Sequence, residues 1–259
     1  SIDGMGIFEI FSSFPMIRSK NLSDEILTPK ISLRANPVNN MINHSSSNKI
    51  ITANNAFSIN RLGISDSFEA GKSLTLGLDY KIDYKNNKFN EKKDKFLEFK
   101  LATVIRDKFE GNIPLSSTID KKNSNLFGSI QNNLLENINI GYDFSIDNDL
   151  KTFESHSLNT EISINNFVTN FYYTEQRDEI GTSHILANTS TYNLDDNNSF
   201  SFSTRRNKEI SLTEYYDLAY QYKNDCLTAA IKYNKEYYSD SDIKPSEELF
   251  FSLTIVPLG

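Results

Sequence analysis

Long stretches of the chain alternate strictly between apolar and polar side chains. The clearest stretch is residues 73–84, SLTLGLDYKIDY, in which every even-numbered residue is apolar and every odd-numbered residue is small or polar. This period of two predicts a β-strand. The length exceeds the roughly 5–6 residues of an ordinary soluble strand and suits the roughly 9–11 residues of a tilted membrane strand. Residues 97–106, 137–147, 216–222 and 227–234 repeat the alternation.

Less regular strands are predicted over most of the remaining chain, for a total of about thirteen, within a range of about 12–14. They are expected near residues 5–18, 24–36, 124–132, 152–165, 167–177, 183–194, 198–208 and 247–258. Turns rich in Asn, Asp and Lys separate them, as at residues 85–88 and 195–198, and such residues tolerate hairpin torsions. A helical pattern longer than a turn or two is considered only around residues 52–62.

The faces of the predicted strands distinguish a membrane barrel from a soluble β-sandwich. The polar faces mix charged residues with Ser, Thr, Asn and Gly over long strands, as in a water-filled lumen. Tyrosines gather toward strand ends, where an aromatic girdle is expected. These tyrosines are Tyr80, Tyr84, Tyr222, Tyr237 and Tyr238. The sequence therefore predicts an all-β fold, an antiparallel transmembrane β-barrel.

Composition and charge narrow the class further. Hydrophobic residues make up 38% of the 259 residues and aromatic residues 12%, which suits strands with one apolar face. The net charge of -7 argues against a general nucleic-acid binder. No apolar run approaches the roughly 18 residues of a membrane helix. Residues 1–20 do not resemble a signal peptide, so the chain is expected to begin inside a longer protein and to form part of a larger barrel.

No pattern of residues points to catalysis, a cofactor or a metal. His44, His156 and His184 are far apart in the sequence, with no Cys or carboxylate at ligand spacing. Nucleophile-elbow, phosphate-loop and dinucleotide motifs are missing as well. The chain is not expected to be an enzyme.

Three segments resemble the family of LPS-assembly outer-membrane proteins (LptD). Residues 215–259 have a Tyr-rich strand, an Asn224-Asp225-Cys226 turn, a strand of the form I-x-Y-x-K and an acidic loop, and end on Pro257-Leu258-Gly259. Residues 57–80, FSINRLGISDSFEAGKSLTLGLDY, and residues 27–37, LTPKISLRANP, resemble a loop of the family and the strand before it. The family often has two adjacent cysteines at the turn, whereas Leu227 follows Cys226 here.

The resemblance implies that residues 1–259 are the C-terminal part of the barrel, without its N-terminal periplasmic domain and early strands. It implies a translocon that inserts lipopolysaccharide into the outer leaflet of the Gram-negative outer membrane through a lateral seam. The implied partners are lipopolysaccharide, an LptE-like plug lipoprotein inside the barrel, and periplasmic bridge proteins that reach the missing domain. The alternatives are a passive porin or other β-barrel channel, and a soluble surface adhesin.

The resemblance also suggests site residues, each beside a plainer interpretation. One side of a lateral gate is expected on the last strand, at Phe251, Leu253, Ile255 and Pro257, although prolines at strand ends are ordinary. Cys226 is expected to form a disulfide with the missing domain, or else to be a free thiol at a turn. An extracellular loop is expected to be ordered by Asn60, Arg61, Asp66 and Glu69, or else to be merely solvated.

Overall fold

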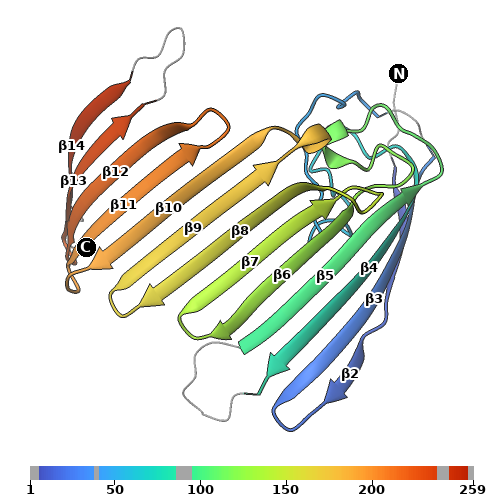
Figure 1. Cartoon of the computed structure of the whole chain (residues 1–259), viewed down its shortest axis with the longest axis horizontal. Helices are drawn as coiled ribbons and strands as arrows, with labels where there is room; N and C mark the ends of the chain where they lie inside the picture. Colours follow the sequence, from blue (N-terminus) through green and yellow to red (C-terminus); the bar gives the residue numbers. More distant parts are fainter. Residues whose placement is uncertain (1–5, 38–40, 86–94, 238–244, 256–259) are drawn as a thin grey trace. The chain divides into compact units, whose positions relative to one another are not determined.

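The computed structural model describes residues 6–37, 41–85, 95–237 and 245–255, and strands dominate it (Figure 1). The first seven strands are β1 (Phe8–Ser13), β2 (Met16–Ser19), β3 (Ser23–Asn36), β4 (Gly71–Tyr84), β5 (Lys95–Arg106), β6 (Leu126–Leu135) and β7 (Ile138–Ile146). The others are β8 (Phe153–Ile164), β9 (Phe167–Gln176), β10 (Ser183–Asn193), β11 (Asn198–Asn207), β12 (Leu212–Lys223), β13 (Leu227–Glu236) and β14 (Ser246–Ile255). Two single-turn 3-10 helices are η1 (Leu115–Ser117) and η2 (Asp178–Ile180).

The strands form an antiparallel sheet in which consecutive strands are neighbours. Its order is β1-β3-β4 and then on in sequence to β14, with β2 also paired with β3. This confirms the predicted all-β antiparallel fold, and fourteen strands lie within the predicted range. The apolar and polar residues of β4 keep to opposite faces along its register with β3 and β5, as the alternation predicted.

Strands β1 and β2 lie end to end along one edge of β3, because β4 occupies the whole of the other edge. The interruption falls at Phe14 and Pro15, where proline has no backbone N–H to donate. The N–H of Phe14 still donates to the carbonyl of Pro29, at 3.1 Å. β1 and β2 therefore occupy the position of one interrupted strand. In the described residues, the fourteen strands thus fill thirteen side-by-side positions in the sheet.

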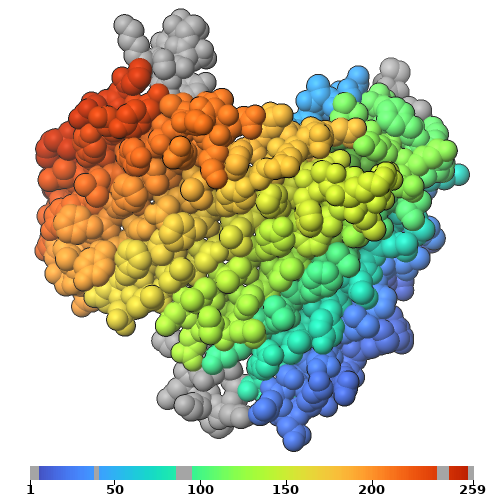
Figure 2. All heavy atoms as spheres, viewed as in Figure 1, coloured from blue at the N-terminus to red at the C-terminus, as the bar shows by residue number. Residues whose placement is uncertain are grey.

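The described chain divides into two compact units. Unit 1 comprises residues 1–136, 141–157 and 176–182, and unit 2 comprises residues 137–140, 158–175 and 183–259. In the space-filling view, side chains of successive strands cover each unit in oblique bands (Figure 2).

The helix considered around residues 52–62 is not formed, and a succession of turns takes its place. The side chain of Asn55 accepts the N–H of Thr52 at 2.8 Å and donates to the carbonyl of Ile50 at 3.2 Å. Such side-chain bonds to the backbone compete with helical hydrogen bonds, which explains why the prediction was wrong. Across the described residues, no helix has the length and apolar character needed to cross a lipid bilayer.

The two faces of the sheet in unit 1 differ sharply. Ser73 and Thr75 of β4 point to the face on which residues 41–70 pack, here the loop-bearing face, and both are buried. Leu76 points to the opposite face, here the bare face, and is exposed. Also on the bare face, the Phe144 ring covers Gly128, where an added Cβ would be 2.0 Å from the ring carbon Cζ. Only glycine leaves room for that ring.

Candidate functional site

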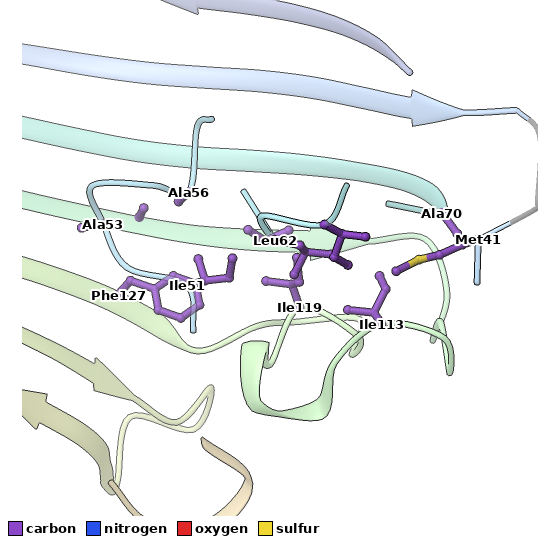
Figure 3. Packing of buried hydrophobic residues seen from close by; sticks show 12 residues of the cluster. Met41, Ile51, Ala53, Ala56, Leu62, Ala70, Ile113, Ile119 and Phe127 are labelled. Carbon is purple, nitrogen blue, oxygen red and sulfur yellow. The ribbon is translucent and has the colours of Figure 1, made fainter. Parts of the chain in front are cut away.

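Residues 41–70, here the inner loop, form a small hydrophobic core with the loop-bearing face of unit 1. Figure 3 shows Ile51 of this loop beside the ring of Phe127 of β6, and Leu62 beside Ile119. The core consists of Met41, Ile51, Ala53, Ala56, Leu62, Ile64, Ala70, Ala102, Val104, Ile113, Ile119 and Phe127. The inner loop is thus a packed element of the fold.

An aromatic contact fixes the middle of the inner loop on β4. The Phe57 ring lies over Gly77, where an added Cβ would come within 2.5 Å of a ring carbon. The ring meets Phe11 of β1 edge-on, at 5.8 Å between centroids, and Lys30 lies 5.8 Å from its centroid. Because Gly77 has no side chain, the Phe57 ring can pack directly against the backbone of β4.

A second long connection, residues 107–125 between β5 and β6, supports the inner loop. The Asn112 side chain donates to the carbonyl of Met41 at 3.1 Å. The hydroxyl of Ser116 donates toward the carbonyl of Lys49 at 3.1 Å and accepts the N–H of Lys49 at 2.8 Å. Both connections leave the strands at the same edge of unit 1, here the long-loop edge.

A buried group of charges ties the inner loop to three strands. Glu69, in the loop, binds Arg61 through two hydrogen bonds of 2.7 and 2.5 Å. It also binds Arg106 of β5 at 2.5 Å and Arg34 of β3 at 3.3 Å. Arg34 in turn donates to Glu9 of β1 at 3.0 Å. These five residues are here the anchor cluster.

The electrostatics of the anchor cluster centre on the Glu69 carboxylate. Burial opposes its charge and by itself would raise its pKa, but the guanidinium groups of Arg61, Arg106 and Arg34 outweigh that penalty. The pKa of Glu69 consequently falls to about 2. Glu69 is therefore ionised at any physiological pH and neutralises part of the buried positive charge.

The same arginines hold the backbone of the inner loop. Arg61 donates to the carbonyl of Ala56 at 3.3 Å and to the hydroxyl of Thr75 at 2.8 Å. Arg34 donates to the carbonyl of Ser58 at 2.8 Å, and Arg106 donates to the carbonyl of Ala70. Each bond to a loop carbonyl replaces a solvent contact that this backbone loses on burial.

The four residues expected to order the loop have different surroundings. Arg61 and Glu69 meet in the anchor cluster. The Asn60 side chain makes local bonds with Ile64, to its carbonyl at 2.8 Å and from its N–H at 3.2 Å. Asp66 is half-exposed and lies 2.9 Å from the Nε2 atom of His44.

Sequence reasoning missed Glu9, Arg34 and Arg106 as members of the cluster. The available signal was an arginine on the polar side of an alternating strand, as at Arg34 and Arg106. Among the described residues, no three His, Cys, Asp or Glu side chains gather as a metal site would require.

The tip of the inner loop reaches further across the sheet. The Asn54 side chain accepts a hydrogen bond from Lys100 of β5 at 3.1 Å. It donates to the hydroxyl of Ser129 of β6 at 3.4 Å and toward Asp143 of β7 at 3.5 Å. The loop thereby contacts the polar side chains of three successive strands.

Beyond the inner loop, charges of opposite sign alternate on the loop-bearing face, here the charge ladder. Lys30 pairs with Asp79, Lys81 pairs with Asp83 at 2.7 Å, and Lys100 pairs with Glu98 at 3.0 Å. The register also places Asp79 opposite Lys100 and Lys81 opposite Glu98. Each lysine of the ladder therefore has acidic neighbours on its own strand or the next.

The residues expected at the lateral gate belong to unit 2. Phe251, Leu253 and Ile255 of β14 are 72%, 65% and 68% exposed, and they lie opposite apolar residues of β13. Strand β14 pairs with β13 and is the last strand in the order of the sheet. Pro257, the fourth residue expected there, lies outside the described residues.

Cys226 lies in the tight turn between β12 and β13. The Asn224 side chain accepts the N–H groups of Cys226 and Leu227, at 3.0 and 2.8 Å, which fixes the turn. The thiol of Cys226 is free and half-buried. Leu227, the next residue, lies opposite Ile255, so Cys226 is at the strand ends where β14 finishes.

Comparison with known proteins gives one family. The family model described as LptD, LPS transport system D, matches residues 3–189. The match covers the whole anchor cluster and the inner loop, whereas Cys226 and β14 lie beyond it. No curated protein matches the chain.

Proposed function

The chain belongs to the LPS transport system D family, a family of outer-membrane transport proteins, and on this premise we propose that it forms part of a translocon wall. In this proposal lipopolysaccharide enters the outer leaflet of the Gram-negative outer membrane through a lateral seam of a β-barrel. Residues 1–259 supply the C-terminal strands of that barrel.

The observation that carries the proposal is the exposed apolar row on β14. Phe251, Leu253 and Ile255 are at least 65% exposed, and β14 ends the order of the sheet. A strand at the end of the order, with an apolar face for acyl chains and a polar face for sugars, suits one side of a seam. The two-faced strands also support insertion in a bilayer, since lipid-facing and lumen-facing residues alternate in membrane barrels.

The anchor cluster supports a second part of the proposal. Longer loops of membrane barrels lie on the cell exterior, which would place the long-loop edge there. The inner loop would then fill the lumen from outside and prevent free diffusion of solutes. Lipopolysaccharide would leave through the lateral seam because the inner loop occupies the path through the lumen.

Cys226 would lie at the opposite, periplasmic edge. An oxidising periplasm favours disulfides, so we propose that Cys226 pairs with a cysteine of the N-terminal periplasmic domain. That domain would receive lipopolysaccharide from the periplasmic bridge proteins. An LptE-like lipoprotein would occupy the part of the lumen that the inner loop leaves open.

Photo-crosslinking in the protein as it exists in the cell tests the seam. A benzoylphenylalanine replaces Leu253 on β14, and in a matched control it replaces Leu218, which is also a leucine, on β12. We expect lipopolysaccharide adducts at residue 253 that require active transport, and far fewer at residue 218. Equal adducts at both positions would contradict the seam. Measurable conductance of small solutes through the purified protein would instead support the passive porin.

A further inference from the structure

An apolar groove lies on the bare face of unit 1, at the long-loop edge. Its volume is about 490 Å³, within the roughly 300–1,000 Å³ of typical ligand sites. Its apolar lining comes from β1, β3, β4 and β5 and consists of Phe8, Ile10, Leu33, Ala35, Leu74 and Ile105. Phe8 is 68% and Ile10 73% exposed, so these walls are open to the surroundings.

The groove exists because a small residue lies between large ones. Ala35 is opposite Phe8 on one side and opposite Lys72 on the other. One residue pair further along, Leu33 lies between Ile10 and Leu74 and closes the groove. The methyl group of Ala35 therefore forms a floor between taller walls.

The floor is held in place from the other face of the sheet. Arg34 and Arg106 are among the residues that line the groove, and their side chains are buried in the anchor cluster. Both guanidinium groups bind Glu69 there. The strands beneath the groove are thus fixed before any ligand binds, which lowers the entropic cost of binding.

One end of the groove carries charged side chains. Lys72 lines it and is exposed, and within the described parts of the chain it has no ion-pair partner. Asp107 lines the groove too, but none of the ion pairs of the described residues joins it to Lys72. The ammonium group of Lys72 is thus not held by an ion pair, and an apolar trough with this group at its end suits an amphiphile with acyl chains and an anionic head.

We propose that this groove binds lipopolysaccharide that has already reached the outer leaflet, with an acyl chain over Ala35 and an anionic head group on Lys72. The inference rests on the proposed function, which places the long-loop edge at the exterior and delivers lipopolysaccharide to that leaflet. The groove lies on β1, β3, β4 and β5, whereas the proposed seam strand is β14. It is therefore a separate lipid site, which would hold a product molecule against the wall of the barrel.

The test is photo-crosslinking from the groove in the protein as it exists in the outer membrane. A benzoylphenylalanine replaces Ile10, and adducts are identified with antibody to lipopolysaccharide and by mass spectrometry. We expect a lipopolysaccharide adduct in the otherwise unchanged protein. Ala35→Phe fills the floor and should reduce the adduct to background. Lys72→Gln removes one exposed charge contact and should lower the yield about fivefold.

Ile31→Phe is the matched control, because Ile31 is exposed on the same face of β3 but does not line the groove. It should leave the adduct unchanged, and gel mobility of the unboiled protein should show that all variants fold. Lys72→Gln keeps the test valid if Ala35→Phe does not fold. An undiminished lipopolysaccharide adduct in the folded groove variants overturns the proposal, as does an adduct with phospholipid alone or no lipid adduct.

The seam experiment at Leu253 is run in parallel, so that failure of the groove proposal can be distinguished from failure of the proposed seam route. Adducts at the seam without adducts in the groove refute the groove alone. Adducts in the groove that respond to Ala35→Phe, without adducts at the seam, support the groove and refute the seam route.

Discussion

Replacing Glu69 by Gln should release the inner loop while leaving the sheet intact. The substitution keeps the size of the side chain but removes the negative charge that Arg34, Arg61 and Arg106 share. Breaking a buried ion pair by removing one partner typically costs about 3–5 kcal/mol, because the remaining charge stays buried without compensation. The lowered pKa of Glu69 gives a similar figure, since a change from 4.5 to about 2 corresponds to about 3 kcal/mol.

The assay is cleavage within residues 41–70 by pepsin, which is active across the relevant pH range. If opening of the loop precedes cleavage, a loss of about 3 kcal/mol raises the cleavage rate about a hundredfold. Asp66→Asn is the matched control, because the Asp66 carboxylate is half-exposed and lies beside a single histidine, His44. It should cost less than about 1 kcal/mol and raise cleavage less than about tenfold.

The pH dependence provides an independent check on Glu69. A carboxyl group whose pKa is lowered by folding stabilises the folded loop fully above its ordinary value of 4.5, and loses this contribution as the pH falls toward about 2. Cleavage of the unchanged protein should therefore accelerate over this interval relative to Glu69→Gln. If Glu69→Gln is cleaved as slowly as Asp66→Asn at pH 5, where Glu69 is still ionised, the anchor cluster does not hold the loop.

Three further experiments test the faces, the thiol and the packing. Leu78→Arg places a charge on the bare face and should block barrel assembly, at a cost of about 2–4 kcal/mol. Gln131→Arg lies on the loop-bearing face opposite an acidic residue and should assemble normally. Gel mobility measures assembly in both cases. Cys226 should hold the barrel to a periplasmic fragment on non-reducing gels after cleavage between the domains; fragments that separate without reductant would exclude the disulfide. Gly128→Ala should cost about 1–3 kcal/mol in urea unfolding because its Cβ would meet the Phe144 ring, and Phe144→Ala in the same chain should recover most of that loss, a recovery that would not occur if the cost were only conformational.

The strands were predictable because their signal is local. Alternation over residues 73–84 places successive side chains on opposite faces whatever the rest of the chain does, and β4 at Gly71–Tyr84 contains that segment. The turn at residues 224–226 was also readable, because Asn224 accepts N–H groups two and three residues along the chain. Both features depend on neighbours in the sequence.

For the opposite reason, only two of the five residues of the anchor cluster were expected from the sequence. Arg61 and Glu69 are eight residues apart within one loop, whereas Arg34 and Arg106 are 35 and 37 residues from Glu69. Their meeting depends on the register of β3, β4 and β5 and on the path of the inner loop. Gly77 likewise gave no sign in the sequence that the Phe57 ring would cover it.

The charge ladder has a kinetic consequence for a sugar that moves along the wall. Lys30 and Lys100 each have an acidic partner, so a passing phosphate must compete with Asp79 and Glu98 for each ammonium group. Binding of a phosphate to any lysine of the charge ladder would therefore be weak, with a short residence time and fast exchange to the next lysine. A row of unpaired lysines would attract the same polyanion more strongly but release it slowly. Under the proposed function, such a wall would guide its cargo with little resistance, and the opening of the seam would then limit throughput more than detachment from the lumen.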